Sequence, residues 1–309
     1  MEFRIAHVFP GQGSQAVGML DAWSEWPVVR HAIEEASDAL GFDMWKMVAS
    51  GSSAQLADTV NTQPIVVAAS VALFRAWSDL GGQIPMLSAG HSVGEIAALT
   101  AAGAMTLTEA MHLVRVRARA MAEAVPHGGG MAAVIGLEDA VVRRLCEEAA
   151  LDDVLEPANF NALGQVVVAG HLRAIERLKP SAKREGAKMV MNLPVSGPFH
   201  SSMMGKAMTT VHAYLSHVSF SKPAFPVIHN VDHAPADTKT MVRSLSLQLI
   251  RPVDWVGTMT GFQRRGVTRV FEIGPGEVLT NLNKRISPTM LSVALNTPAA
   301  MEKAMKTLL

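Results

Sequence analysis

A serine between two glycines, in the stretch 90–95 of sequence G-H-S-V-G-E, constrains the backbone of this chain more than any other feature. The pattern G-x-S-x-G is typical of a nucleophile elbow, a sharp turn between a strand and a helix that exposes the serine hydroxyl. Residues 86–89 can form a short buried strand, and residues 95–102 are rich in helix formers and stop at Gly103. We therefore expect a strand, a glycine turn that carries Ser92, and a helix.

A second glycine loop lies near the N-terminus. Residues 5–9 are suited to a buried strand, and the loop 10–15, P-G-Q-G-S-Q, follows at once. Backbone N–H groups in such a loop can turn outward and donate to an oxyanion. A tight turn without chemistry explains these residues equally well.

Helices and strands alternate through the larger part of the chain, which favours an α/β fold with a mostly parallel sheet. Beyond the elbow, we expect strands at 225–231 and 270–273, and helices at 24–40, 54–60, from Gln63-Pro64 to about Leu80, 107–124, 201–216, 245–249 and 279–285.

The middle of the chain follows a different order. We expect strands at 131–137, 154–160, 165–169 and 188–193, and helices at 138–150 and 171–185. This order, β-α-β-β-α-β, is that of a ferredoxin-like unit. The preceding stretch 126–130, P-H-G-G-G, is interpreted as a hinge. We therefore predict a small ferredoxin-like domain, 127–196, inserted into a larger domain that consists of 1–126 and 197–309.

The helix at 107–124 carries a charge on its apolar face. At about 100° per residue, its alanine, leucine, valine and methionine residues fall on one arc, and Arg117 is the only charged residue among them. Arg115 and Arg119 fall on the opposite, polar arc. Arg117 either extends to the rim or pairs with a distant acid, or projects a guanidinium into a pocket, where it can bind a ligand carboxylate bidentately.

Composition excludes several classes of function. The chain has 309 residues, 49% of them hydrophobic, which is ample for a large core. Lys plus Arg and Asp plus Glu number 27 each, so no net field favours nucleic acid or an anionic membrane. The single Cys146 excludes an internal disulfide and a cysteine metal cluster, and its helical spacing from Val142 and Ala149 indicates a core thiol.

No targeting, membrane or metal signal is evident. Glu2 and Arg4 leave no apolar segment for a signal peptide, and the longest apolar run, 65–74, is too short to span a bilayer. The 19 Met and 11 His residues include no H-E-x-x-H or comparable spacing. We expect a cytoplasmic protein without a metal.

A serine nucleophile needs a base, which is most often a histidine. His200 is the best-placed candidate, because the Gly/Pro loop 194–199 presents it just before a helix. His91 adjoins the serine, but neighbours in a tight turn point apart, so we expect His91 to pack or to bond locally.

These motifs together resemble the malonyl-CoA:acyl carrier protein transacylases, which are acyltransferases of bacterial fatty-acid synthesis related to polyketide acyltransferase domains. The matching segments run in family order through nearly the whole chain: 9–15, 90–95, the helix carrying Arg117, 197–201, 248–255 and 274–279. The fold that the resemblance implies is an α/β-hydrolase-like large domain with an inserted ferredoxin-like domain.

The resemblance also implies roles for single residues. Ser92 would be the acylated nucleophile and His200 its base. The backbone amides of Gln12 and Val93 would form the oxyanion hole, with Gln12 also contacting substrate, and Arg117 would bind the malonyl carboxylate. The position of Gln248 would supply a carbonyl that orients His200, so no Asp is required, although Asp232 and Asp254 are alternative orienters. Asn159-Phe160-Asn161 matches a family stretch near the site, and a structural role there is as good an interpretation.

The implied substrates are malonyl-CoA, with CoA as product, and the phosphopantetheine arm of acyl carrier protein; no cofactor, nucleic acid or membrane is implied. Two departures from the family stand out: the loop 128–131 is a residue shorter than is common, and Glu277 replaces a frequent Lys. Two other classes remain open, a serine hydrolase or thioesterase and a non-catalytic carrier-binding subunit. Arg117 argues against the first, and an intact Ser92 with His200 argues against the second.

An acidic carrier needs a local basic patch, because the net charge is zero. Two clusters of basic residues are candidates: Lys179, Lys183, Arg184 and Lys188 in the predicted insert, and Arg264, Arg265, Lys284 and Arg285 near the C-terminus.

Overall fold

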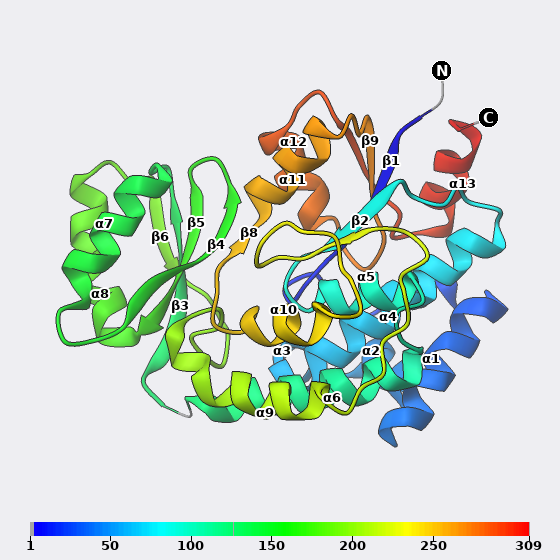
Figure 1. Cartoon of the computed structure of the whole chain (residues 1–309), viewed down its shortest axis with the longest axis horizontal. Coiled ribbons are helices and arrows are strands. Elements are labelled where there is room, and N and C mark those ends of the chain that lie inside the picture. The colour runs from blue at the N-terminus through cyan, green and yellow to red at the C-terminus, as the bar shows by residue number, and fades with distance from the viewer. Residues whose placement is uncertain (1–2, 126, 309) are drawn as a thin grey trace.

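The computed structural model describes residues 3–125 and 127–308, which form two five-stranded sheets (Figure 1). The first sheet has the order β10-β9-β1-β2-β7, and all its strand pairs are parallel. Its strands are β1 (Ile5–Phe9), β2 (Leu87–Gly90), β7 (Val227–Ile228), β9 (Arg269–Glu272) and β10 (Leu291–Ala294). The mixed α/β architecture with a parallel sheet is therefore confirmed.

Helices cover both faces of this sheet. Alternate side chains of each strand point to opposite sides, so both faces are apolar and each packs against helices. Ala6 and Val8 of β1 pack in one cluster with residues of α11 (Trp255–Arg264) and α12 (Val278–Ile286). Ile5 and Phe9 join the main core on the other face. The helices that supply that core are α1 (Pro27–Leu40), α2 (Met44–Ser50), α4 (Thr59–Asp79), α5 (Gly94–Ala101), α6 (Leu107–Ala124), α9 (Gly205–Leu215), α10 (Met241–Leu247) and α13 (Pro298–Lys306). The short α3 (Ser53–Ala57) precedes α4, and two 3-10 turns lie at Asp21–Trp23 and Ser202–Met204.

The second sheet has the order β6-β3-β5-β4-β8. Its first four strands pair antiparallel, and α7 (Asp139–Ala150) and α8 (Leu172–Arg184) pack on one face, at the left of Figure 1. These strands are β3 (Gly129–Ile135), β4 (Leu155–Ala162), β5 (Gln165–His171) and β6 (Met189–Asn192), in the predicted element order. The fifth, β8 (Val253–Asp254), comes from far along the chain and runs parallel to β4.

Several elements differ from the sequence expectation. The helix expected to open at Gln63-Pro64 begins instead at Thr59, because the Asp58 side chain accepts a hydrogen bond from the Val60 N–H and caps it; Pro64 lies inside the helix. The sequence analysis assigned no elements to α2, α11, α13, β8 or β10. Of the predicted hinge 126–130, Gly129 and Gly130 form the first residues of β3, and Pro126 lies outside the described residues.

Parallel strands bring the loops at their carboxyl ends to one edge, where ligands bind in open α/β sheets. Phe9 pairs with Gly90, so the glycine loop after β1 and the elbow after β2 start at the same level. The Phe9 carbonyl accepts from the His91 N–H, which ties the two loops together. In the part of the chain that the structure describes, no helix is long and apolar enough to cross a membrane.

Candidate active site

Ser92 stands on the predicted turn between β2 and α5, with a left-handed φ of 53°. The two glycines are required by close packing: a Cβ on Gly90 would lie 1.9 Å from the Gly94 carbonyl carbon, and one on Gly94 would lie 2.2 Å from the Phe9 oxygen. Asn230 fixes the strained turn, since its Oδ1 accepts from the Ser92 N–H at 2.9 Å and its Nδ2 donates to the Gly90 carbonyl at 2.7 Å. The elbow is therefore held rigidly, with the serine side chain directed into a cavity.

His200 meets this serine from 108 residues further along the chain, and its Nε2 lies 2.7 Å from Ser92 Oγ. Its Nδ1–H donates to the Gln248 carbonyl oxygen at 2.8 Å. Because a carbonyl oxygen only accepts, this bond places the proton on Nδ1 and leaves Nε2 free to accept the serine proton. Burial, and then the charge of Arg117, lower the pKa of His200 to about 3. The imidazole is therefore a neutral acceptor at neutral pH.

The two alternative orienters lie elsewhere. Asp254 caps α11 by accepting from the Gly257 N–H at 2.8 Å, and Asp232 accepts from the Ala234 N–H at 3.0 Å. A backbone carbonyl, and neither of these acids, is the partner of His200 Nδ1.

Arg117 is 2% exposed, as its place on the apolar face of α6 predicted. Its Nη1 donates to Gln63 Oε1 at 2.6 Å, and its Nη2 donates to Gln248 Oε1 at 2.8 Å and to Ser92 Oγ at 3.2 Å. Burial lowers its pKa to about 10, and the charge of Glu95 opposes that fall. The guanidinium therefore stays cationic at neutral pH, beside the serine.

A cavity of about 100 Å³ joins these groups. Gln12 and Val93 line it together with Ser92. Among the described residues, neither the Gln12 N–H nor the Val93 N–H donates a backbone hydrogen bond in a turn, loop or cap. The Gln12 side chain exchanges hydrogen bonds with Thr59 at 3.2 Å. The remaining walls are largely apolar, and their side chains are Met121, Met131, Leu193, Val195 and Phe199.

The His91 side chain packs against a neighbouring ring, as expected, but its hydrogen bond is to a residue 70 positions away and links the two sheets. Its Nε2 lies 2.8 Å from Asn161 Oδ1 at the end of β4, and its ring packs at 5.6 Å from that of Trp255. Asn159, on the same strand, lines the cavity where the pairing register of β4 shifts. Bulges of this kind often re-aim side chains next to active sites.

The sequence analysis did not identify three polar residues of the site: Gln63, Glu95 and Asn230. Asn230 had a signal that could have been used, since it lies near the carboxyl end of the predicted strand 225–231, and that end faces the site. In the sequence, Glu95 carries only the signal of a helix former and Gln63 only that of a helix start. The buried Gln248 side chain, as distinct from its carbonyl, was also missed.

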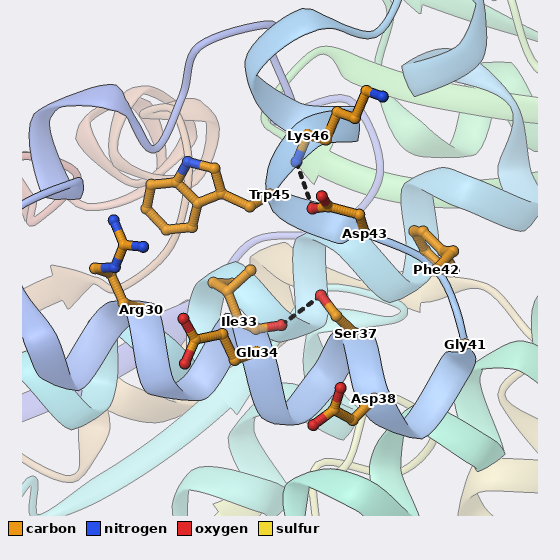
Figure 2. Close-up of a pocket in the computed structure, with 10 residues that line it drawn as sticks. All are labelled: Arg30, Ile33, Glu34, Ser37, Asp38, Gly41, Phe42, Asp43, Trp45 and Lys46. Carbon is orange, nitrogen blue, oxygen red and sulfur yellow. Dashed lines mark hydrogen bonds between the residues drawn. The ribbon is translucent and has the colours of Figure 1, made fainter.

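A larger hollow of about 810 Å³ lies between α1 and α2 and shares no lining residue with the Ser92 cavity (Figure 2). Two of its polar side chains form hydrogen bonds with helix backbone: Ser37 Oγ donates to the Ile33 carbonyl, and the Asp43 side chain accepts from the Lys46 N–H. Within residues 3–125 and 127–308, no group of three or more His, Cys, Asp or Glu side chains could hold a metal ion.

Comparison with known proteins adds independent findings. Residues 6–276 match the acyl transferase domain family. Over 305 residues the chain is 45% identical to the malonyl CoA-acyl carrier protein transacylase of Salmonella typhimurium, covering 98% of this chain and 99% of that protein. The crystal structure of an acyl-carrier-protein S-malonyltransferase from Burkholderia pseudomallei superposes with a TM-score of 0.96 at 46% identity, covering 99% and 100% of the two chains. A malonyl-transacylase solved with its type II polyketide acyl-carrier protein gives 0.96 at 42% identity, covering 98% and 99%.

Proposed function

The chain belongs to the acyl transferase domain family, and from that membership we propose that it transfers a malonyl group from malonyl-CoA to the phosphopantetheine thiol of acyl carrier protein, in fatty-acid biosynthesis. The observation that carries the proposal is the meeting of three groups in one cavity. Ser92 Oγ lies 2.7 Å from His200 Nε2 and 3.2 Å from a buried guanidinium nitrogen of Arg117.

The first half of the reaction loads the enzyme. His200 Nε2 takes the proton of Ser92 Oγ as this oxygen attacks the thioester carbonyl of malonyl-CoA. The backbone N–H groups of Gln12 and Val93 stabilise the oxyanion that forms. When the carbon–sulfur bond breaks, the CoA sulfur receives the proton from His200, and a malonyl ester remains on Ser92.

The second half reverses these steps with a different thiol. The phosphopantetheine thiol gives its proton to His200 and attacks the ester carbonyl, and Ser92 leaves with that proton. The carbonyl of Gln248 keeps the imidazole in the same tautomer in both halves, because the proton on Nδ1 stays there and donates to that carbonyl oxygen throughout.

Arg117 binds the malonyl carboxylate in this proposal, and the Gln12 side chain contributes to the same substrate pocket. The geometry favours a transferase of a carboxylated acyl group over a simple ester hydrolase, since an apolar ester gives no counter-charge to a guanidinium that is 2% exposed. A buried cation beside the acyl group, with no charge on the substrate to meet it, would only weaken the binding of such an ester.

We propose further that the molecule consists of two domains. The discontinuous large domain, 1–126 and 197–309, is α/β-hydrolase-like, which its parallel sheet and the elbow after β2 support. The inserted domain, 127–196, is ferredoxin-like, which the order β6-β3-β5-β4 and its antiparallel pairs support. Acyl-CoA is a cytoplasmic metabolite, so we propose a cytoplasmic location.

Intact-mass measurement after mixing with malonyl-CoA tests the function. The protein should gain one malonyl group at Ser92 and release CoA before any carrier is present, and added carrier should then remove the group. No adduct, or an adduct that survives Ser92→Ala, would refute the proposal. Loss of the group to water at the same rate without carrier would identify a hydrolase instead.

A further inference from the structure

A buried carboxylate lies directly beneath the elbow. Glu95 follows Ser92 by three residues, is 0% exposed, and is not among the residues that line the substrate cavity. Its Oε2 accepts from the Gln248 side-chain amide at 2.6 Å and from the Asn230 N–H at 3.1 Å. Its Oε1 accepts from His229 Nδ1 at 2.6 Å. The carboxylate thus touches no reacting atom, although it contacts the residues that hold them.

Glu95 and the Ser92 carbonyl together determine which way the Gln248 amide points, because Gln248 Nε2 donates to Glu95 Oε2 at 2.6 Å and to the Ser92 carbonyl oxygen at 3.1 Å. A side-chain amide has one donor end and one acceptor end, and a carboxylate can only accept. Gln248 Nε2 therefore faces Glu95, and Gln248 Oε1 must face the opposite side, where it accepts from Arg117 Nη2 at 2.8 Å. If the amide were flipped, its NH₂ would face the guanidinium and both donors would be unpaired.

The negative charge of the same carboxylate also interacts electrostatically with Arg117, on the other side of this amide. Burial lowers the pKa of Arg117 and the charge of Glu95 raises it, so removing that charge would lower the pKa of Arg117 further. His229, on the other carboxylate oxygen, is a separate link: burial lowers its pKa, but the hydrogen bond and charge of Glu95 outweigh burial and raise it overall. His229 and Gln248 contact different oxygens of Glu95, so substitutions of the two residues break different hydrogen bonds.

We propose that Glu95 is a positioning residue for malonyl recognition. It fixes the Gln248 amide so that the Arg117 guanidinium is held toward Ser92, and it balances the charge of that guanidinium before the substrate carboxylate arrives. Because Gln248 also orients His200 through its backbone carbonyl, the side-chain link acts mainly on the choice of acyl group. This inference rests on the proposed malonyl transfer.

The test compares Ser92 acylation by malonyl-CoA and acetyl-CoA, measured as CoA release, in four variants. Glu95→Gln should lower the malonyl to acetyl ratio of kcat/KM by roughly 10-fold or more, because a charge-assisted hydrogen bond is lost behind Arg117. His229→Asn leaves the Oε2 link intact and should change the ratio by less than about threefold. Glu272→Gln is the matched control: Glu272 is 1% exposed and accepts two backbone N–H groups at the start of α12, so its loss should lower the melting temperature and leave the ratio unchanged.

A swapped pair keeps the test decisive if Glu95→Gln does not fold. In Glu95→Gln with Gln248→Glu, the new amide can donate to the new carboxylate, and the net charge is preserved. The negative charge then lies directly against Arg117, so malonyl transfer should fall at least 10-fold further than acetyl transfer.

An unchanged ratio in a folded Glu95→Gln or swapped variant would overturn the proposal, and so would an equal change in Glu272→Gln. A wild-type chain that forms no malonyl adduct would instead refute the proposed function itself.

Discussion

Replacing Arg117 by alanine should separate recognition of malonyl from chemistry on the serine. The side chain is 2% exposed and donates three hydrogen bonds at the base of the cavity. Without it, the malonyl carboxylate is buried against apolar walls with no counter-charge, a loss of roughly 3 to 5 kcal/mol. At about 1.4 kcal/mol per tenfold, kcat/KM for malonyl-CoA should fall by about two to three and a half decades.

Acetyl-CoA should respond in the opposite sense. Its acyl group has no carboxylate, so the substitution removes an unmatched buried charge from its binding site. The charge of Arg117 also lowers the pKa of His200, after burial, so its removal makes the imidazole a stronger base. Acetyl transfer should therefore be preserved or rise, and the selectivity of the enzyme should collapse or invert.

The assay is CoA release with each substrate, together with thermal melting. Melting alone decides nothing, because Arg117→Ala also leaves the amide oxygens of Gln63 and Gln248 without their donor and should destabilise the fold. Arg119→Ala, on the exposed face of the same helix, is the control and should leave both rates unchanged. A parallel fall for malonyl-CoA and acetyl-CoA in Arg117→Ala would refute the carboxylate-binding role, even if Ser92 were still acylated.

Four further outcomes are expected. Since the pKa of His200 is about 3, kcat/KM for CoA release should stay level from pH 8 to pH 5, and a midpoint near pH 6.5 would contradict this. Burial lowers the pKa of His7 to about 3, so below pH 6.5 the unfolded chain binds a proton that the folded chain does not. The free energy of unfolding therefore decreases as the pH is lowered, by about 2 kcal/mol at pH 5. His7→Leu should remove this part of the acid loss in urea unfolding, and an unchanged pH dependence would count against it. Gln248→Ala keeps the carbonyl that orients His200, so acetyl transfer should largely persist while malonyl selectivity drops; inactivity toward both substrates would show that the carbonyl alone does not suffice. Salt should slow transfer to the carrier more than transfer to free pantetheine, and equal sensitivity would exclude electrostatic steering.

Local rules predicted the elements that have strong local signals. The glycine pattern placed the elbow between β2 and α5, and the helix expected at 107–124 agrees with α6, which begins with a capping box at Thr106. The shorter elements were harder: α2 and α13 are each introduced by a capping side chain, Asp43 or Thr297, that was not used. β8 has two residues, and it is a strand only because it pairs with β4, 94 positions earlier, a contact that no local pattern contains.

The residues of the candidate site also differ in whether the local sequence predicts them. Helical periodicity alone placed Arg117 on a buried face, because a charge among apolar side chains is a local irregularity. The Gly/Pro loop indicated His200 as the base, whereas the role of Gln248 is implied only by the family motifs; their positions agree with hydrogen bonds that span 108 and 48 residues. Gln63 and Asn230 had no motif of their own. Their partners are known only once the helices and strands have packed.

Strain at the site connects these observations. Ser92 and His200 are both non-glycine residues with left-handed φ, 53° and 59°, and each such conformation costs free energy that surrounding contacts must offset. Asn230 holds the first through two hydrogen bonds, and the carbonyl of Gln248 holds the second. Both holders meet at Glu95, whose Oε2 accepts from Asn230 and from Gln248. The nucleophile and its base are thus each held by a neighbouring amide residue, Asn230 or Gln248, which explains how two strained residues from distant loops come within 2.7 Å without an acid in direct contact with the histidine.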